Sequence, residues 1–165
     1  MMFAVNTYAL NIVGTLHLPL VERFYADNGY RVKCGRLDRV YIFTLDGKIV
    51  AAARLILQQS NTYLLRNLCV ATDYRRQGIA SQFLSGILPG LTPTNCYCFI
   101  SATLQSFYEG IGFACLAVDE VALDKLTLDE VPAEIIDMHV RQRKRKRGWI
   151  LMGFVHDHSH FTSCQ

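Results

Sequence analysis

The sequence predicts a mixed α/β fold in a single domain over residues 1–165. The chain is 51% apolar and 19% charged, which is sufficient for one full hydrophobic core. Asp46-Gly47 separates two strand-like runs, residues 40–45 and 48–57, and this dipeptide is the strongest short signal for a β-hairpin. Residues 63–88 then have the pattern strand, polar loop, helix, which indicates a βαβ-like crossover. We therefore expect a mixed sheet with hairpins first and a crossover later.

The N-terminal half predicts one short helix among its strands. Residues 3–8 alternate weakly and form a candidate first strand. Pro19 suits the first turn of a helix, whose apolar residues recur at helical spacing until the polar residues 27–29 end it. After the hairpin, residues 63–71 predict another strand.

The C-terminal half predicts two helices, a third weaker one, and three strands. The apolar face of the first helix begins at Ile79, and Pro89-Gly90 closes it. The remaining elements are a strand at 96–101, a short helix at 104–109, a strand at 113–121, a weak helix at 129–138 and a last strand at 149–155.

Composition argues against a membrane or secreted protein. No apolar run reaches the roughly 18 to 20 residues needed to span a bilayer. The best stretch, residues 9–21, is interrupted by polar residues and by Pro19. No Lys or Arg precedes Arg23, so the charged region of a secretory signal is missing. We therefore expect a cytoplasmic protein with no membrane partner.

The six cysteines are interpreted as reduced core thiols, because they lie in apolar surroundings and no pair has CxxC spacing. Cys96 and Cys98 are two apart and would share one face of a strand. Three histidines alternate near the C-terminus and could ligate a metal, although a frayed tail is the favoured interpretation, and we expect no metal. The cysteines are Cys34, Cys69, Cys96, Cys98, Cys115 and Cys164, and the histidines are His156, His158 and His160.

The net charge of +3 hides one strongly basic segment. Six of the 17 Lys and Arg residues lie within residues 141–147, which leaves 11 basic against 14 acidic residues elsewhere. Such a run can bind nucleic acid or another polyanion. No aromatic residue is interleaved with the charges, so a solvated turn before the last strand is favoured, and nucleic acid is an unlikely partner.

Residues 68–80 carry the most informative chemistry. An apolar strand ends, a basic loop comes next, and Gly78 opens a helix, which directs several backbone N–H groups and the positive helix end at one point. Gly78 lets the backbone approach a ligand closely, and Arg75 and Arg76 add charge suited to phosphate. This pattern predicts a pyrophosphate site.

Two motifs resemble one enzyme superfamily. Arg75-x-x-Gly78-x-Ala80 matches the Arg/Gln-x-x-Gly-x-Gly/Ala signature of the GNAT N-acetyltransferases, and residues 107–113, FYEGIGF, resemble their "YEKxGF" segment. The two motifs occur in the expected order, and the plan of residues 40–121 is similar to that fold. The resemblance implies a mostly antiparallel mixed sheet that splays at a bulged strand, with acetyl-CoA bound in the opening.

The resemblance also implies where the acyl donor binds. Cys69 and Val70 occupy the strand that pairs with the pantetheine arm. The pyrophosphate is expected on the loop and the helix start, at Arg75, Arg76, Gln77, Gly78, Ile79, Ala80 and Ser81.

Tyr108 matches the tyrosine that donates a proton to the leaving CoA thiolate. A phenol with a pKa near 10 is close to a thiol in acidity and keeps its own proton at neutral pH. The alternative is a packed core aromatic. Phe107 and Phe113 are assigned to packing.

The chain departs from the superfamily pattern in ways that leave the general base unassigned. Ser101 stands where many members carry Asn, and Arg66-Asn67 occupy the stretch where many carry a Glu. Glu22 is a candidate base or acceptor-site residue, with a surface salt bridge as the alternative. Arg54 and Arg66 interrupt apolar strands, so they either bind an acceptor carboxylate or phosphate or form ion pairs.

The sequence thus predicts transfer of an acetyl group from acetyl-CoA to a primary amine, by direct attack within a ternary complex. The acceptor is a small-molecule or peptide amine that the sequence does not name. A CoA-binding sensor or interaction module of the same fold is the alternative, and a homodimer is an open possibility.

Overall fold

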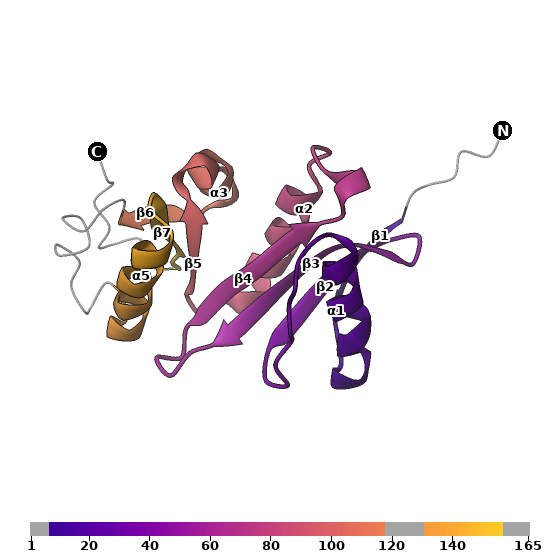
Figure 1. The fold of residues 1–165 in the computed structure, drawn as a ribbon, viewed down its shortest axis with the longest axis horizontal. Helices are drawn as coiled ribbons and strands as arrows, with labels where there is room; N and C mark the ends of the chain where they lie inside the picture. The colour runs from indigo at the N-terminus through magenta and orange to yellow at the C-terminus, as the bar shows by residue number, and fades with distance from the viewer. Residues whose placement is uncertain (1–6, 118–130, 157–165) are drawn as a thin grey trace. The chain divides into compact units, whose positions relative to one another are not determined.

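The structure, a computed structural model, describes residues 7–117 and 131–156. Its strands join in the order β1-β2-β3-β4-β5-β7-β6, with β4 and β5 parallel and the pairs β1-β2, β2-β3, β5-β7 and β6-β7 antiparallel (Figure 1). The predicted mixed α/β fold is therefore confirmed. The strands are β1 (Tyr8–Ile12), β2 (Arg39–Leu45), β3 (Lys48–Leu57), β4 (Tyr63–Val70), β5 (Cys96–Ser101), β6 (Ala114–Ala117) and β7 (Trp149–Phe154). The helices are α1 (Leu18–Asp27), α2 (Ile79–Ile87), α3 (Gln105–Ile111) and α5 (Ala133–Arg145).

Contacts divide the chain into two compact units. The first unit is Met1–Leu57 with Leu65–Gly90, and the second is Gln58–Leu64 with Leu91–Gln165. Strand β4 begins in the second unit, where its first residues pair with β5, and ends in the first unit. The sequence-based expectation of one domain stays a prediction.

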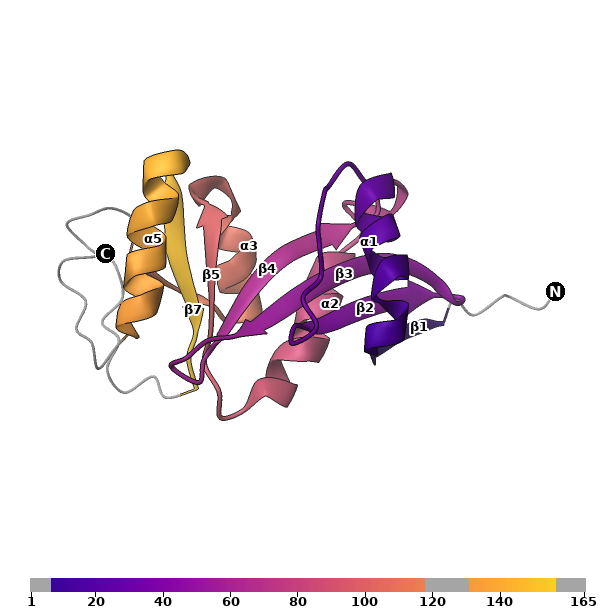
Figure 2. The same ribbon diagram turned by 60° about the horizontal axis from the view of Figure 1, so that its bottom comes forward.

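In the first unit, α1 and α2 cover opposite faces of the strands (Figure 2). Under α1, Val21 and Tyr25 pack against Val40 of β2 and Ala52 of β3. On the other face the Phe83 ring of α2, fully buried, stacks on the β2 residue Phe43 at 5.7 Å between centroids. The Asp46-Gly47 hairpin between β2 and β3 forms as predicted, with positive φ at both residues.

Strand β1 lies further along the chain than the sequence predicted. It spans Tyr8–Ile12, whereas the prediction placed a strand at residues 3–8, most of which fall outside the described residues. All five β1 residues are exposed, so burial of one face does not define this strand. Pairing with β2, from Tyr8 opposite Leu45 onward, defines the strand instead.

In the second unit, one face of β5 packs against α5. Phe99 stacks on His139 of α5, and Tyr97 packs in the same core cluster as Ile135 of that helix. Cys96 and Cys98 are buried and alternate with these two residues along the strand, so they share the opposite face, as predicted.

Residues 141–145 of the basic run are helical, so its interpretation as a turn before the last strand is wrong for these residues and holds only for Lys146 and Arg147. Helix α5 extends to Arg145 and includes Arg141, Arg143 and Lys144, whereas the predicted helix ended at residue 138. Arg and Lys are good helix formers, and their charge is favourable beside the negative C-terminal end of a helix. The charged residues were interpreted as a sign of a solvated turn, although the same residues favour a helix.

Further findings concern membrane, metal and thiol chemistry. None of the described helices is long and apolar enough to cross a membrane. Within residues 7–117 and 131–156, no three His, Cys, Asp or Glu side chains gather where they could share a metal ion. The five described cysteines are thiols. His156 contacts the loop before β5, with Nε2 3.1 Å from the Thr94 carbonyl oxygen. His158, His160 and Cys164 lie outside the described residues.

We expect His139 to make the protein sensitive to acid. Its ring is fully buried, and no partner of either ring nitrogen is found among the described residues. Burial, reinforced by the charge of Arg143, lowers the pKa of His139 from 6.5 to about 4. The unfolded state therefore binds this proton first, and stability falls as pH falls from about 6.5 toward 4, by about 1–2 kcal/mol between pH 7 and pH 5.

Urea unfolding at pH 7 and pH 5 checks this expectation. His139→Phe keeps the stack on Phe99 and removes the titrating group, so this variant should lose less stability between the two pH values than the parent protein. Equal losses in both proteins would show that other groups cause the acid sensitivity.

Candidate functional site

The loop between β4 and α2 has the backbone geometry of an anion-binding nest. Arg76 has φ +60° and Gly78 has φ +76°, so two left-handed residues lie next to the start of a helix. Alternation of right- and left-handed residues turns successive N–H groups toward one side, which forms a concavity for anions. Gly78 takes this conformation without strain because it has no Cβ.

The first turn of α2 lacks an internal cap. The first α-helical hydrogen bond runs from the Gln82 N–H to the Gly78 carbonyl, at 3.1 Å. The N–H groups of Ile79, Ala80 and Ser81 lie before this bond, outside the helical hydrogen-bond pattern. No side chain caps this end, and no acidic residue lies in the first turn. The positive end of the helix dipole therefore meets exposed, basic loop residues, an arrangement that favours an anion.

Several hydrogen bonds hold this loop against the rest of the first unit. The Thr72 N–H donates to Asn28 Oδ1 at 3.0 Å, which ties the loop to the end of α1. Arg75 Nε donates to the Val70 carbonyl at 3.0 Å, and the Ala71 N–H donates to the Val50 carbonyl at 2.8 Å. Arg75 is thus a structural contact of the end of β4 as well as an exposed loop charge.

Strand β4 is irregular just before the predicted pantetheine-binding residues. Asn67 has φ +55°, in the left-handed region. The regular alternation of the strand also fails here, because Leu64 and Leu65 are both buried and Arg66 and Asn67 are both exposed. An extra residue that breaks the alternation is the mark of a β-bulge. The irregularity lies where the resemblance implies a bulge.

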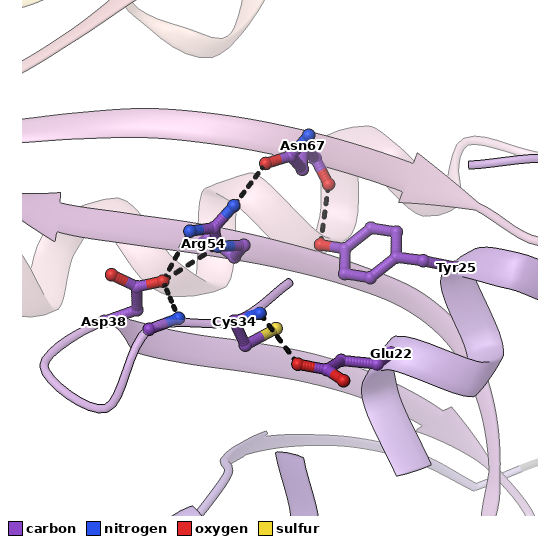
Figure 3. Close-up of polar contacts among 7 residues, drawn as sticks. Glu22, Tyr25, Cys34, Asp38, Arg54 and Asn67 are labelled. Atoms are coloured by element: carbon purple, nitrogen blue, oxygen red, sulfur yellow. Dashed lines mark hydrogen bonds and ion pairs between the residues drawn. The ribbon is translucent and has the colours of Figure 1, made fainter. Parts of the chain in front are cut away.

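A polar network surrounds the irregular residue (Figure 3). Arg54 of β3 donates to Asp38 Oδ2 from Nε at 2.9 Å and from Nη2 at 2.6 Å. Its Nη1 donates to Asn67 Oδ1 at 2.8 Å. From the other side, the Tyr25 hydroxyl of α1 donates to the Asn67 carbonyl oxygen at 2.7 Å. The ion pair is the second of the two alternatives that the sequence left open for Arg54, and an acceptor contact of Arg54 stays a prediction.

Glu22 and Arg66, the other two acceptor-site candidates, have different surroundings. Glu22 accepts hydrogen bonds from Lys33 Nζ at 2.8 Å and from the Cys34 N–H at 2.9 Å. The hydrogen bond from Lys33 is the main cause that lowers the pKa of Glu22. A carboxylate held in this way is a weak general base. Arg66 is exposed on β4.

Cys69 is buried beneath α1 in the core cluster of the first unit. Burial raises the pKa of its thiol, with the nearby Arg75 charge as a smaller, opposing influence. The thiol form therefore dominates at neutral pH, which disfavours Cys69 as a nucleophile.

Tyr108 lies in the second unit, on α3. Its ring packs edge-to-face against Phe107 at 5.1 Å and Phe113 at 5.3 Å, so both phenylalanines have the packing role that the sequence predicted. Only 5% of Tyr108 is exposed, and burial raises the pKa of the phenol above its ordinary value of 10. The hydroxyl is protonated at neutral pH, and burial makes it a weaker acid than an exposed phenol.

Three residues of the polar network were not predicted from the sequence: Asn67, Asp38 and Tyr25. Asn67 carried a local signal, because Asn inside an apolar strand is the residue other than Gly that best tolerates a left-handed backbone. Asp38 and Tyr25 carried none, because their partners lie 16 and 42 residues away in the chain.

Comparison with known proteins gives a family match for part of the chain. The sequence-family model described as the acetyltransferase (GNAT) domain matches residues 36–115. This range includes the hairpin, β4, the nest, α2, β5 and α3. Residues 36–115, which are 80 of the 165 residues, therefore match a GNAT acetyltransferase domain. Both motifs that suggested this family in the sequence lie inside the matched range.

Solved GNAT structures resemble the chain over most of its length. The ribosomal-protein-S18-alanine N-acetyltransferase from Escherichia coli aligns with a TM-score of 0.63 and 16% identity, over 94% of this chain and 99% of that one. A putative streptothricin acetyltransferase from Bacillus anthracis in complex with acetyl coenzyme A gives 0.56 and 14%, over 92% and 99%. N-acetylglutamate synthase from Neisseria gonorrhoeae, complexed with coenzyme A and N-acetyl-glutamate, gives 0.58 and 15%, over 89% and 34%. At such identities the similarity establishes the fold.

Among curated proteins, no sequence matches the chain.

The left-handed backbone at Gly78 predicts a cost for any side chain there. A Cβ at this position would meet no atom within 4 Å, so Gly78→Ala tests backbone strain alone. We expect this variant to lose about 1–2 kcal/mol of unfolding free energy in urea denaturation. Gly90→Ala is the matched control, because Gly90 also has open space around it and lies outside the left-handed region. A Gly78→Ala protein that is as stable as the Gly90→Ala protein would contradict the strained geometry.

Proposed function

We propose that the protein is an N-acetyltransferase that moves an acetyl group from acetyl-CoA to a primary amine. The observation that carries this proposal is the uncapped start of α2 behind the left-handed residues Arg76 and Gly78, within a GNAT acetyltransferase domain. This backbone fits a pyrophosphate, because it offers several N–H donors and no acidic side chain in the helix's first turn. The proposal keeps the cytoplasmic location that the sequence suggested.

The donor would be held by backbone groups on two neighbouring segments. Residues 75–81 would bind the pyrophosphate, chiefly through their N–H groups, with Arg76 supplying additional charge. Cys69 and Val70 would pair with the pantetheine arm through the strand backbone. Acetyl-CoA supplies the acetyl group as a thioester.

Two groups of the chain would assist the transfer. A backbone N–H near Val70 would polarise the thioester carbonyl and stabilise negative charge on its oxygen. Tyr108 would donate its phenolic proton to the departing thiolate. The amine attacks directly, so no acyl-enzyme is needed, and the buried thiol of Cys69 supports this choice.

The acceptor would be a small-molecule or peptide amine. Two of the similar structures belong to enzymes named for acetylation of an alanine residue and for synthesis of N-acetylglutamate. Arg66, exposed on β4, and Glu22 remain proposed acceptor-site residues. We assign no general base, because the Glu22 carboxylate is held by Lys33 and Cys34.

A CoA-binding sensor of the same fold is the second candidate. Two observations favour it: Glu22 is engaged in an ion pair, and Ser101, whose hydroxyl lies 3.0 Å from the Thr103 hydroxyl, stands where many GNAT enzymes carry Asn.

Tyr108→Phe separates the two candidates. We expect at least a tenfold loss of acetyl-transfer rate, because the variant removes a proton donor while keeping the ring that packs between Phe107 and Phe113. CoA affinity, measured by isothermal titration, should change less than twofold. Transfer is monitored as release of free thiol with a panel of small and peptide amines.

Tyr30→Phe is the matched control, because Tyr30 is 47% exposed and has no assigned role. An unchanged rate in Tyr108→Phe would remove Tyr108 from the mechanism. Tight CoA binding by the parent protein without turnover of any amine would favour the sensor, and failure to bind CoA or acetyl-CoA would contradict both candidates.

A further inference from the structure

We propose that Arg54 and Asp38 are positioning residues for the acyl donor. They hold Asn67 in its left-handed conformation, and this conformation fixes the direction of the backbone groups of residues 68–70. The inference rests on the proposed function, which assigns Cys69 and Val70 to the pantetheine arm.

The ion pair of Arg54 and Asp38 is a shielded contact of fixed geometry rather than an exposed surface contact. Two nitrogens of the Arg54 fork donate to one oxygen of Asp38, which also accepts the Gly35 N–H at 2.7 Å. Only 14% of the Arg54 side chain and 8% of the Asp38 side chain are exposed. A pair shielded in this way is screened little by salt, and its fixed geometry restricts the guanidinium to one orientation.

Asn67 accepts hydrogen bonds from two sides, from Arg54 of the ion pair and from Tyr25 of α1. Arg54 Nη1 donates to its side-chain oxygen, and the fully buried Tyr25 donates to its main-chain oxygen. A rotation of Asn67 to an ordinary strand conformation would turn the carbonyl away from Tyr25. Because Tyr25 is buried, its hydroxyl would then lose the acceptor that the structure gives it.

The conformation of Asn67 sets the orientation of the last residues of β4. Side chains and backbone groups alternate with a period of two in a strand, so an irregular residue decides which face each later residue presents. With Asn67 left-handed, Cys69 points into the core under α1. The Arg75 bond to the Val70 carbonyl then fixes the other end of the segment. Residues 68–70 are therefore held between two anchors.

A direct acceptor contact is the competing role for Arg54. The structure argues against it, because Nε, Nη1 and Nη2 all donate within the first unit. The two roles also differ in what they affect: a positioning residue changes donor affinity, whereas an acceptor ligand changes only the affinity for the amine.

Donor binding by Arg54→Met tests the proposal. Isothermal titration would use CoA and, as a second probe, 3′-phosphoadenosine 5′-diphosphate, which is the nucleotide half of CoA without the pantetheine arm. We expect at least tenfold weaker binding of CoA and less than a twofold change for the nucleotide. Arg23→Met is the matched control, because it breaks an exposed ion pair with Asp27 that does not touch the network.

Two substitutions of Asn67 isolate the backbone effect. Asn67→Ala and Asn67→Gly both remove the amide that Arg54 contacts, but only glycine takes a positive φ freely. We expect Asn67→Ala to weaken CoA binding at least tenfold and Asn67→Gly to remain within about threefold of the parent. The double variant Arg54→Met with Asn67→Gly should bind CoA better than Arg54→Met alone.

The outcomes separate this inference from the proposed function. Equal CoA affinity in Arg54→Met and the parent would overturn the inference and leave the function intact. Parallel losses for CoA and nucleotide, or equal effects of Asn67→Ala and Asn67→Gly, would also overturn it, because they indicate general damage or a role of the amide alone. If the parent binds no CoA, the proposed function fails, and the donor-positioning inference falls with it.

Discussion

The structure of the first unit depends on an ion pair. The Arg54 guanidinium on β3 is shielded from water and must therefore have a partner. A charge removed from water is costly unless partners surround it, so Asp38 must reach it from the loop before β2. Gly35 allows the tight approach, because its N–H donates to the Asp38 carboxylate and a Cβ there would lie 3.0 Å from that group. From this pair, hydrogen bonds continue to Asn67 and through Tyr25 to α1. Two strands, a loop and a helix are thus linked by a few polar contacts.

Local signals predicted the parts of the fold that local chemistry determines. The Asp46-Gly47 hairpin and the helix that begins after Gly78 both depend on residues that tolerate positive φ, and the structure has both. Elements determined by distant partners were predicted poorly. Strand β1 is defined by its register with β2. The end of α5 was missed for a different reason, because its charged residues were interpreted as a solvated turn although Arg and Lys favour a helix.

The same division applies to the candidate site. The nest and the aromatic packing around Tyr108 arise from two short motifs, so the sequence could place them. The surroundings of Arg54 and Glu22 could not be predicted, because each pairs with a residue 11 or more positions away. For both side chains the sequence offered an ion pair or an acceptor contact as alternatives, and only the folded geometry shows the ion pairs.

Asn28 connects the end of α1 to the nest, and this gives the loop a chemical vulnerability. Its Nδ2 donates to the Phe24 carbonyl at 2.8 Å, and its Oδ1 accepts the Thr72 N–H. Gly29 comes next in the chain, and an asparagine before a glycine is the pairing most open to spontaneous deamidation, since the small neighbour lets the backbone nitrogen attack the side-chain amide. Conversion of Asn28 to aspartate would remove the donor to Phe24 and place a negative charge next to a loop suited to anions. Ageing of the purified protein would then weaken anion binding without any change in the loop's own residues.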